Sequence, residues 1–339
     1  MVSFCELTTI GVGGNVLNYE KVQSRTEAKS AIDSLNGTDF KIVGGGSNVL
    51  PKDGVFRTPL VHLVPNLSLR YSKQDYIWAG QSLDEVAQRY HLSALSGIPG
   101  TLGGAIVQNA GAYGAQISDF VHSVEVYDFE SKKFEVWSKL KCQFNYRNSH
   151  FKQLIKENTC NFLVTGARLE PAQGFIRVEH PQLASALGVS LGSQKTAEEV
   201  REQVLFLRDQ KGMLAPLFNY GSKFDTDRNS CGSFFTNPLV PEFYKKFLPS
   251  DTPTYTSGKP GYIKVSAAFL IEQAGITRGF KLPEHKYATV SSKHTLAITN
   301  TRPSYTNDAG AEVRELSKYI QAQVHKQFNI ELEPEVVIL

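Results

Sequence analysis

The hydrophobic and polar positions along this chain follow helical spacing in some segments and strand spacing in others. Apolar residues recur every three or four positions in five segments, which predicts helices over 24–35, 82–90, 196–211, 266–274 and 308–328. Short apolar or alternating runs predict strands at 40–43, 60–64, 76–79, 162–169 and 295–298, a hairpin within 120–144, and an extended segment around Pro334. Beyond one small βαβ-like unit near the N-terminus the two kinds of segment do not alternate, which indicates an α+β fold.

The polar residues at segment ends refine this picture. Ser82 with Glu85, and Thr196 with Glu199, have the spacing of a capping box and predict the starts of two helices. Residues 175–192 are less periodic and are predicted as a loop with a short helix. Residues 212–230 are rich in Asn, Gly, Asp and Ser, which predicts a domain junction or an extended loop.

Two glycine-rich stretches interrupt the pattern. The longer one, residues 96–114, combines its glycines with apolar residues, and the shorter one runs from the predicted strand at 40–43 into residues 44–48. Glycine lets main-chain N–H groups approach an anion such as a diphosphate, and a helix start adds to that attraction. A tight turn between core elements explains the longer stretch alone equally well. Two such loops in one chain favour a dinucleotide, although neither loop has the spacing of a Rossmann fingerprint or a P-loop.

Three motifs in these stretches carry a family resemblance: Gly-Gly-Gly-Ser-Asn-Val-Leu at 44–50, Gly-Ile-Pro-Gly-Thr-Leu-Gly-Gly-Ala at 97–105, and Gln-Asn-Ala-Gly-Ala-Tyr-Gly at 108–114. They closely resemble the UDP-N-acetylenolpyruvoylglucosamine reductase (MurB) family, whose members are flavoproteins that make UDP-N-acetylmuramate for peptidoglycan. The resemblance runs from Thr8 to Glu335. It implies FAD as cofactor, NADPH as reductant, and a UDP-sugar enolpyruvyl ether as substrate, with NADPH and substrate taking turns in one cleft.

The resemblance also implies a domain organisation. We expect an FAD-binding domain of the vanillyl-alcohol-oxidase/PCMH type in two subdomains, residues 1–55 and 56–211. A C-terminal α+β substrate-binding domain follows over 212–329, and residues 330–339 return to the active site.

Three catalytic residues follow from the resemblance. Arg147 lies in a Tyr-Arg-x-Ser element and Glu335 in Leu-Glu-Pro-Glu, and together they would stabilise the enolate of the substrate. Ser233, in Gly-Ser-Phe-Phe-x-Asn-Pro, would donate a proton to the carbanionic carbon, with Cys231 as a rival donor. A guanidinium binds carboxylate or enolate oxygens at two points. From the residues alone, a surface arginine is the preferred interpretation of Arg147, a serine beside glycine most commonly belongs to a turn, and Glu335 fits a solvated acidic edge on which Glu333 and Glu335 would point the same way along a strand.

Binding residues are carried over motif by motif. The residues expected to contact FAD belong to the two glycine stretches: Gly44, Gly45, Gly46, Ser47, Asn48, Val49, Pro99, Gly100, Thr101, Gly103, Gly104, Ala105, Gln108, Asn109, Gly111, Ala112 and Tyr113. Those expected to contact the substrate are Tyr146, Lys211, Asn237 and His294, of which the lysine would meet the diphosphate. A histidine in such a place is as often structural as binding.

The composition of the chain limits the kinds of binding partner and the cellular compartment that we expect. The chain has 339 residues and a net charge of +3, which argues against nucleic acid as the main partner. Its four cysteines show no C-x-x-C spacing, so no metal or redox motif is predicted, and unpaired thiols suit a reducing cytoplasm. We see no signal peptide and no stretch long enough to span a membrane, and we expect a cytoplasmic monomer.

Two other functions compete, and two departures from the family pattern stand out. An FAD-dependent oxidase of the same fold, acting on a sugar or alcohol, would show rapid reoxidation of its flavin by oxygen. A nucleotide-binding protein without activity would have lost one of the three catalytic residues. His180 stands where many members of the larger class carry a tyrosine on a loop over the nucleotide. The stretch 213–228 is longer than the usual link and has no assigned role.

Overall fold

A four-stranded antiparallel sheet forms the base of the molecule in the computed structural model, which describes residues 2–35, 37–69, 76–172, 174–214, 225–302 and 309–339. Its strand order is β11-β10-β12-β7. The strands are β7 (Ile77–Trp78), β10 (Val121–Asp128), β11 (Phe134–Ser138) and β12 (Phe162–Leu169). The hairpin predicted within 120–144 is therefore confirmed, since β10 pairs with β11 in antiparallel register.

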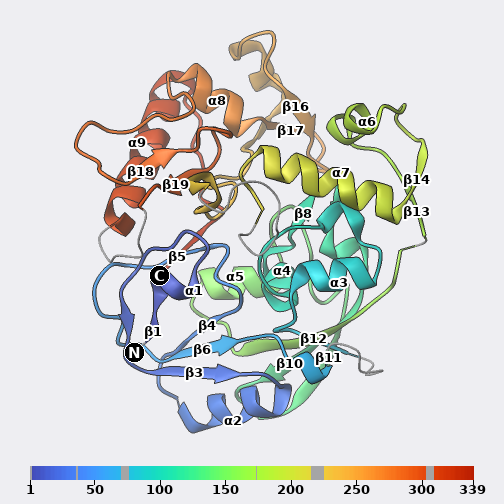
Figure 1. Cartoon of the computed structure of the whole chain (residues 1–339), viewed down its shortest axis with the longest axis vertical. Coiled ribbons are helices and arrows are strands. Elements are labelled where there is room, and N and C mark those ends of the chain that lie inside the picture. The colour runs from blue at the N-terminus through green and yellow to red at the C-terminus, as the bar shows by residue number, and fades with distance from the viewer. Residues whose placement is uncertain (1, 36, 70–75, 173, 215–224, 303–308) are drawn as a thin grey trace.

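A second sheet of three parallel strands lies beside the first (Figure 1). It contains β3 (Tyr19–Val22), β4 (Lys41–Val43) and, between them, β6 (Leu60–Leu63). Helix α2 (Arg25–Leu35) crosses from β3 to β4 and buries Ala28, Ala31 and Ile32, the apolar face that its spacing predicted. The predicted βαβ-like unit is confirmed and delivers the first glycine loop directly after β4.

Helices surround the second glycine stretch. They are α3 (Leu83–Arg89), α4 (Leu102–Gln108), α5 (His150–Lys156) and α7 (Ala197–Gln210). Thr196 and Glu199 cap α7 reciprocally, as predicted. The capping box predicted at Ser82 is wrong, because the Ser82 side chain accepts no capping hydrogen bond; Ser82 lies in an antiparallel bridge with Thr101.

The segment predicted as a loop at 175–192 also contains regular structure. Helix α6 (Pro181–Leu187) is the predicted short helix, but β13 (Phe175–Arg177) pairs with β14 (Gln194–Thr196) in a two-stranded sheet. No residue of this small sheet is buried, so its strands lack the apolar alternation that marks a half-buried strand. The predicted junction at 212–230 lies partly outside the described residues.

The C-terminal part builds a separate core. Its elements are β15 (Leu239–Pro241), β16 (Thr254–Thr256), β17 (Tyr262–Val265), α8 (Ala267–Gln273), β18 (Ala288–Val290), β19 (Ile298–Asn300) and α9 (Ala309–Phe328). The stripe Val313, Leu316, Ile320 and Val324 of α9 is fully buried, as its period predicted. The strand predicted at 295–298 begins only at Ile298, because the amide of Ala297 closes a turn onto the carbonyl of His294.

Both chain ends enter other parts of the fold. Ile10, Val12 and Leu50 pack into the C-terminal core, whereas the strand β20 (Val337–Ile338) pairs in parallel with β5 (Val49–Leu50), directly after the first glycine loop. The C-terminus therefore lies beside the N-terminal elements in Figure 1. The remaining short strands and helix are β1 (Val2–Ser3), α1 (Phe4–Leu7), β2 (Asn15–Val16), β8 (Gly111–Ala112) and β9 (Ala115–Gln116).

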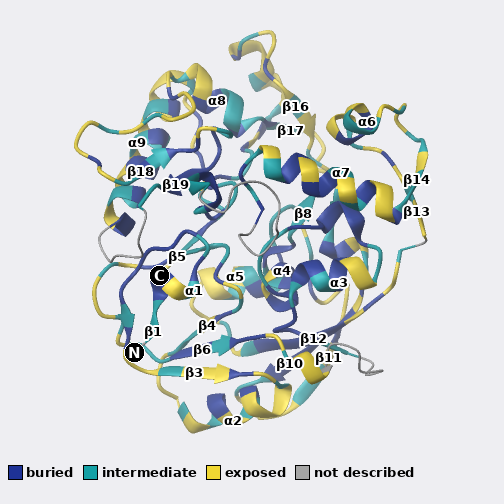
Figure 2. Ribbon diagram, viewed as in Figure 1, coloured by how far each residue is buried: buried dark blue, intermediate teal, exposed yellow. Residues whose placement is uncertain are grey.

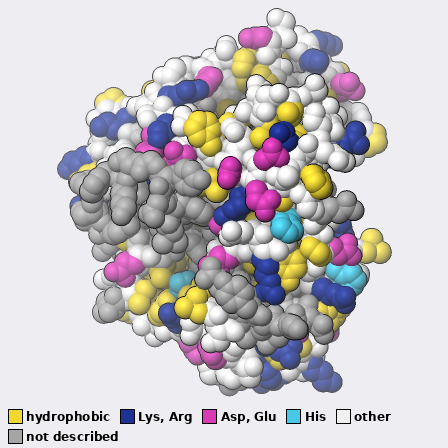
Figure 3. Space-filling model, turned by 45° about the vertical axis from the view of Figure 1, so that its right-hand side comes forward, with side chains coloured by type: hydrophobic (Ala, Val, Ile, Leu, Met, Phe, Trp, Pro, Cys, Tyr) yellow, Lys and Arg dark blue, Asp and Glu magenta, His cyan; other side chains and the backbone are white. Residues whose placement is uncertain are grey.

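The surface shows no separation of charge on the face that Figure 3 presents, where acidic and basic side chains are interspersed. Buried residues concentrate in α4, whereas α7 has one buried face and one exposed face (Figure 2). No helix in the described part of the chain is long and apolar enough to cross a membrane.

Candidate active site

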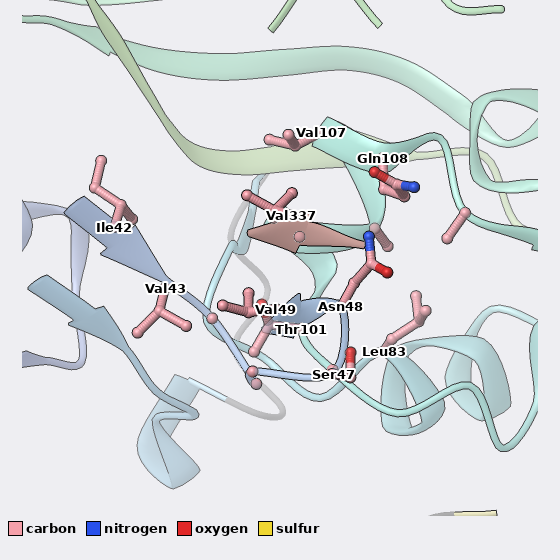
Figure 4. Close-up of a pocket in the computed structure, with 18 of the residues that line it drawn as sticks. Ile42, Val43, Ser47, Asn48, Val49, Leu83, Thr101, Val107, Gln108 and Val337 are labelled. Atoms are coloured by element: carbon pink, nitrogen blue, oxygen red, sulfur yellow. The ribbon is translucent and has the colours of Figure 1, made fainter. Parts of the chain in front are cut away.

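The two glycine loops are in direct contact with each other. The Ser47 hydroxyl donates to the carbonyl of Pro99 at 2.8 Å. A Cβ on Gly45 would lie 2.6 Å from Cα of Gly100, well inside van der Waals contact. Figure 4 shows Ser47 and Thr101 on the facing segments. Part of the glycine content is therefore explained by close packing of one loop on the other.

This contact gives a first prediction. Replacing Gly45 with Ala should push the loops apart, because the new methyl meets backbone that cannot rotate away. We expect a loss of stability of about 1–3 kcal/mol and a lower content of bound flavin. The measurements are thermal unfolding and the flavin-to-protein absorbance ratio. Gly174→Ala is the control, since nothing lies within 4 Å of its added Cβ. A Gly45→Ala protein that melts and holds flavin as the control does would contradict the contact.

The start of α4 is less open to an anion than the sequence suggested. Its first two amides, of Leu102 and Gly103, donate to the carbonyls of Gln81 and Ala79 at 2.9 and 2.8 Å. They are thus already engaged by the chain that follows β7. Gly104, in the second position of its glycine pair, is exposed and lies on a cavity wall. We therefore expect the approach of a ligand along the side of α4 rather than at its end.

One cavity of about 1370 Å³ runs along both glycine loops. Every residue predicted to contact FAD lines it except Asn109. Asn109 is fully buried, in the left-handed conformation that ends α4, and its amide donates to the carbonyl of Asn145 at 2.7 Å. Its place is therefore behind the cavity wall, where it holds the loop that carries Arg147.

Arg147 and Glu335 meet on this wall although they are far apart in sequence. Arg147 Nε lies 3.1 Å from Glu335 Oε1, and one guanidinium NH2 donates to the carbonyl of Gly111 at 2.6 Å. Gln108 Nε2 donates to the same carboxylate oxygen at 3.2 Å, and Asn48 Nδ2 donates to the backbone carbonyl of Glu335 at 3.0 Å. Figure 4 shows both amides beside the strand that carries Val337. The carboxylate is thus bridged to the arginine, as its expected role requires.

The neighbouring glutamate differs from Glu335 in exposure. Glu333 is exposed, whereas Glu335 lines the cavity. The segment pairs with Phe234–Thr236, since the Thr236 amide donates to the carbonyl of Glu333 and the Glu335 amide donates to that of Phe234, and the shared direction of the two side chains stays a prediction. Because Glu333 is exposed and Glu335 is not, Glu333 is a matched control for mutagenesis of Glu335.

The backbone of Arg147 is held in an unusual conformation. Its φ is +50°, in the left-handed region that non-glycine residues rarely adopt. The Lys152 ammonium donates to the carbonyl of Arg147 at 3.0 Å, and Ser149 caps helix α5 while its hydroxyl donates to the carbonyl of Val107. Burial lowers the pKa of Lys152 from its ordinary value. These contacts fix the loop that aims the guanidinium at Glu335.

Ser233 lines the same cavity, after the left-handed Gly232. Its rival Cys231 also reaches the wall but is 94% buried, and its thiol points to the carbonyl of Val49 at 3.5 Å. Burial raises the pKa of Cys231 to about 12. These observations favour the serine as proton donor.

The residues predicted to bind substrate divide into two groups. Lys211, Asn237 and His294 line the cavity, whereas Tyr146 does not. Tyr146 lies under the ammonium of Lys264, 4.3 Å from the ring centre, and burial raises its pKa. Asn237 Oδ1 accepts a hydrogen bond from the amide of Ala267 at 2.9 Å.

His294 is a neutral ring in the folded protein. Burial lowers its pKa from 6.5 to about 4, and the amide of Leu296 donates to Nδ1 at 3.1 Å. The unfolded chain takes up this proton near pH 6.5, whereas the folded chain does so only near pH 4. Stability from this group is therefore complete above pH 6.5 and is lost as the pH falls toward 4.

We expect His294→Asn to reduce the fall in unfolding midpoint between pH 7 and pH 4.5. Asparagine keeps an acceptor for the Leu296 amide and removes the proton uptake. The slope should shrink rather than vanish, because burial also lowers the pKa of His62 to about 4. The exposed His325→Asn serves as control and should leave the slope unchanged. Equal slopes in both variants would show that His294 does not titrate as described.

Two further cavity residues, His180 and Arg208, have side chains suited to binding. His180 occupies the N-cap position of α6 without a side-chain capping hydrogen bond and packs edge-on against Tyr113, with ring centres 5.5 Å apart. Arg208 lies in the last turn of α7. Its sequence signal is its position four residues after Val204 and eight after Val200, inside the apolar stripe of the helix.

Several buried nitrogen atoms on this wall have no hydrogen-bond partner in the described part of the chain. They are Nε of Arg147, Nδ1 of His180 and Nε of Arg208. Buried polar atoms are rarely left unpaired, so these atoms suit a polar or anionic ligand. With the exposed glycine face of α4, they fit a dinucleotide such as FAD.

Comparisons with known proteins place this site in a class and then in a family. The model of an FAD-binding domain matches residues 19–133, and that of the UDP-N-acetylenolpyruvoylglucosamine reductase C-terminal domain matches 224–339. The crystal structure of MurB from Thermus caldophilus is similar, with a TM-score of 0.62 at 23% identity, over 99% of this chain and 97% of that one. The chain is therefore an FAD-dependent oxidoreductase of α+β fold.

Curated relatives give the family. UDP-N-acetylenolpyruvoylglucosamine reductase of Tropheryma whipplei strain Twist is 36% identical over 100% of this chain and 99% of its own length. The protein of that name from Thermobifida fusca is 33% identical over 100% and 97%. The chain belongs to the UDP-N-acetylenolpyruvoylglucosamine reductase family, which confirms the resemblance noted in its motifs.

Proposed function

We propose that this chain reduces UDP-N-acetylglucosamine enolpyruvate to UDP-N-acetylmuramate with NADPH, as a cytoplasmic monomer in peptidoglycan precursor synthesis. The observation that carries the proposal is that Arg147 and Glu335 form an ion pair on the wall of the cavity that the glycine loops line, and that Ser233 lines the same cavity. FAD, when bound, supplies hydride transfer from the nicotinamide to the substrate.

The glycine loops and the amides beside them hold the cofactor. Gly104 exposes backbone to the cavity, and Gln108 and Asn48 close its wall near the C-terminal tail. Because β20 pairs with β5, any ligand that orders the first glycine loop also supports the segment that carries Glu335.

Arg147 and Glu335 stabilise the charge that develops on the substrate. Hydride addition at C3 of the enolpyruvyl group places negative charge on C2 and on the adjoining carboxylate. A guanidinium already fixed by Gly111 and Glu335 meets this charge without reorganising, which is the condition for electrostatic stabilisation.

Ser233 completes the reaction by donating its hydroxyl proton to C2. The proton forms the new C–H bond, and the serine oxygen recovers a proton from solvent. General acid transfer of this kind requires a donor at the cavity surface, where Ser233 lies.

Lys211, Asn237 and His294 are the substrate-binding residues of the proposal. Lys211 carries its charge at the end of α7 and donates to Gln182 Oε1 at 2.8 Å, a neutral partner that leaves its charge available for a diphosphate. Tyr146 is proposed to act from behind the wall, through the loop that it shares with Arg147.

Steady-state kinetics test the proposal that both substrates use one cavity in turn. We expect double-reciprocal plots against NADPH, at several sugar-nucleotide concentrations, to be parallel. Intersecting lines would require both ligands to be bound together and would contradict a single shared site. Oxygen consumption in place of sugar-nucleotide reduction would instead support an oxidase.

A further inference from the structure

Arg208 brings a buried positive charge to the cavity wall and forms no ion pair with a carboxylate in the described part of the chain. Only 9% of the residue is exposed. Its NH2 group donates to the carbonyl of Met213 at 2.8 Å, and its Nε–H has no partner among the described residues. Burial lowers its pKa to about 10, the direction expected for a charge that is poorly compensated.

Two other arginines in this region, Arg201 and Arg228, are each paired with an aspartate. Arg201, two turns earlier on α7, donates to both carboxylate oxygens of Asp84 at 2.8 Å. Arg228 pairs with Asp209 at 2.5 Å. A buried arginine without such a partner is costly to the folded state. A bound anionic ligand would therefore compensate the buried charge of Arg208.

The surroundings of Arg208 indicate the chemistry of that ligand. Lys211 follows three residues later on the same face of α7, and its ammonium lies 5.5 Å from the ring centre of Tyr113. Burial and, to a smaller extent, the charge of Arg208 lower the pKa of Lys211, and both side chains line the cavity. His180, with its unpartnered Nδ1, packs on the same tyrosine. Two cations that share a cavity wall fit a group with more than one negative oxygen.

We propose that Arg208 binds a nucleotide diphosphate in the cavity, with its Nε–H donating to a diphosphate oxygen. This inference rests on the proposed function, in which FAD and the UDP-sugar each carry a diphosphate. Charge-assisted hydrogen bonds from a guanidinium to phosphate oxygens are among the stronger ones in proteins. The structure supplies the donor, and the experiment decides which of the two nucleotides supplies the acceptor.

The test uses the holoenzyme and two variants. Arg208→Gln removes the charge, and Arg208→Lys keeps the charge but loses the planar fork. Arg177→Gln, at an exposed position on β13, is the control for loss of one positive charge. UDP binding is read from the change in flavin absorbance, and FAD release from the rise in flavin fluorescence after dilution.

We expect Arg208→Gln to weaken UDP binding or to speed FAD release by about 10–100-fold, with Arg208→Lys between it and wild type. An effect on UDP alone assigns the substrate diphosphate, and an effect on FAD alone assigns the cofactor. Values within twofold of wild type in both assays would overturn the inference, whatever the variants do to stability. Wild-type protein that binds neither nucleotide would contradict the proposed function as well.

Discussion

Replacing Ser233 with Ala should leave reduction of the bound flavin by NADPH unchanged and slow the reaction with the sugar nucleotide by about 10³-fold, a typical contribution of a general acid. The physical reason is that hydride addition leaves a negative charge at C2 that only a proton can quench. Alanine at this site removes one oxygen atom from the cavity wall and no described hydrogen bond. Stopped-flow absorbance of the flavin, measured in two separate half-reactions, gives both rates.

The variant Cys231→Ala tests whether the proton donor is Ser233 or the alternative candidate, Cys231. The thiol is buried, points at the carbonyl of Val49 and has a pKa raised to about 12 by burial. We therefore expect Cys231→Ala to keep the second half-reaction of the wild type. A large loss in Cys231→Ala together with full activity in Ser233→Ala would reverse the assignment.

Glu335→Gln should produce the second large effect, a slowing of the sugar-nucleotide half-reaction by about 10²-fold. The amide is nearly isosteric, but it removes the charge that holds Arg147 Nε at 3.1 Å and that Gln108 also contacts. The guanidinium then loses its fixed position before the charge develops. Reduction by NADPH should be spared, because this step creates no enolate.

Glu333→Gln is the matched control for this variant. It lies two residues away on the same tail, carries the same charge and is exposed. It should behave as wild type in both half-reactions. Loss of bound flavin in Glu335→Gln, with full flavin in Glu333→Gln, would give Glu335 a structural role in the pairing of β20 with β5 rather than a catalytic one.

The sequence predicted the helices whose limits are determined by local apolar periodicity and by capping residues. Helices α2 and α9 have strong apolar stripes, and α7 has a reciprocal cap at Thr196, so each lies close to its predicted range. No side-chain cap forms at Ser82, which instead lies in an antiparallel bridge with Thr101 of the second glycine stretch. Contacts of that kind depend on the tertiary fold and leave no local pattern.

The sequence motifs predicted which residues belong to the candidate site, but they did not predict how these residues are arranged in space. The resemblance supplied Arg147, Ser233 and Glu335, but their position on one cavity wall depends on the return of β20 to β5, which brings Glu335 to Arg147. Asn109 and Tyr146 belong to the same motifs and yet do not line the cavity, because a motif does not say which side of the wall a residue occupies. Arg208 could have been noticed as a charge inside an apolar stripe, but its lack of a carboxylate partner is visible only in three dimensions.

The central claim is that the cavity reduces a sugar-nucleotide enolpyruvate with electrons from NADPH, and one measurement tests it most directly. Purified holoenzyme is reduced by one equivalent of NADPH without oxygen, and UDP-N-acetylglucosamine enolpyruvate is then added while the flavin absorbance is followed. The account predicts reoxidation of the flavin, with one UDP-N-acetylmuramate formed for each NADPH consumed. A flavin that stays reduced with the sugar nucleotide and is reoxidised only when oxygen is admitted would contradict it.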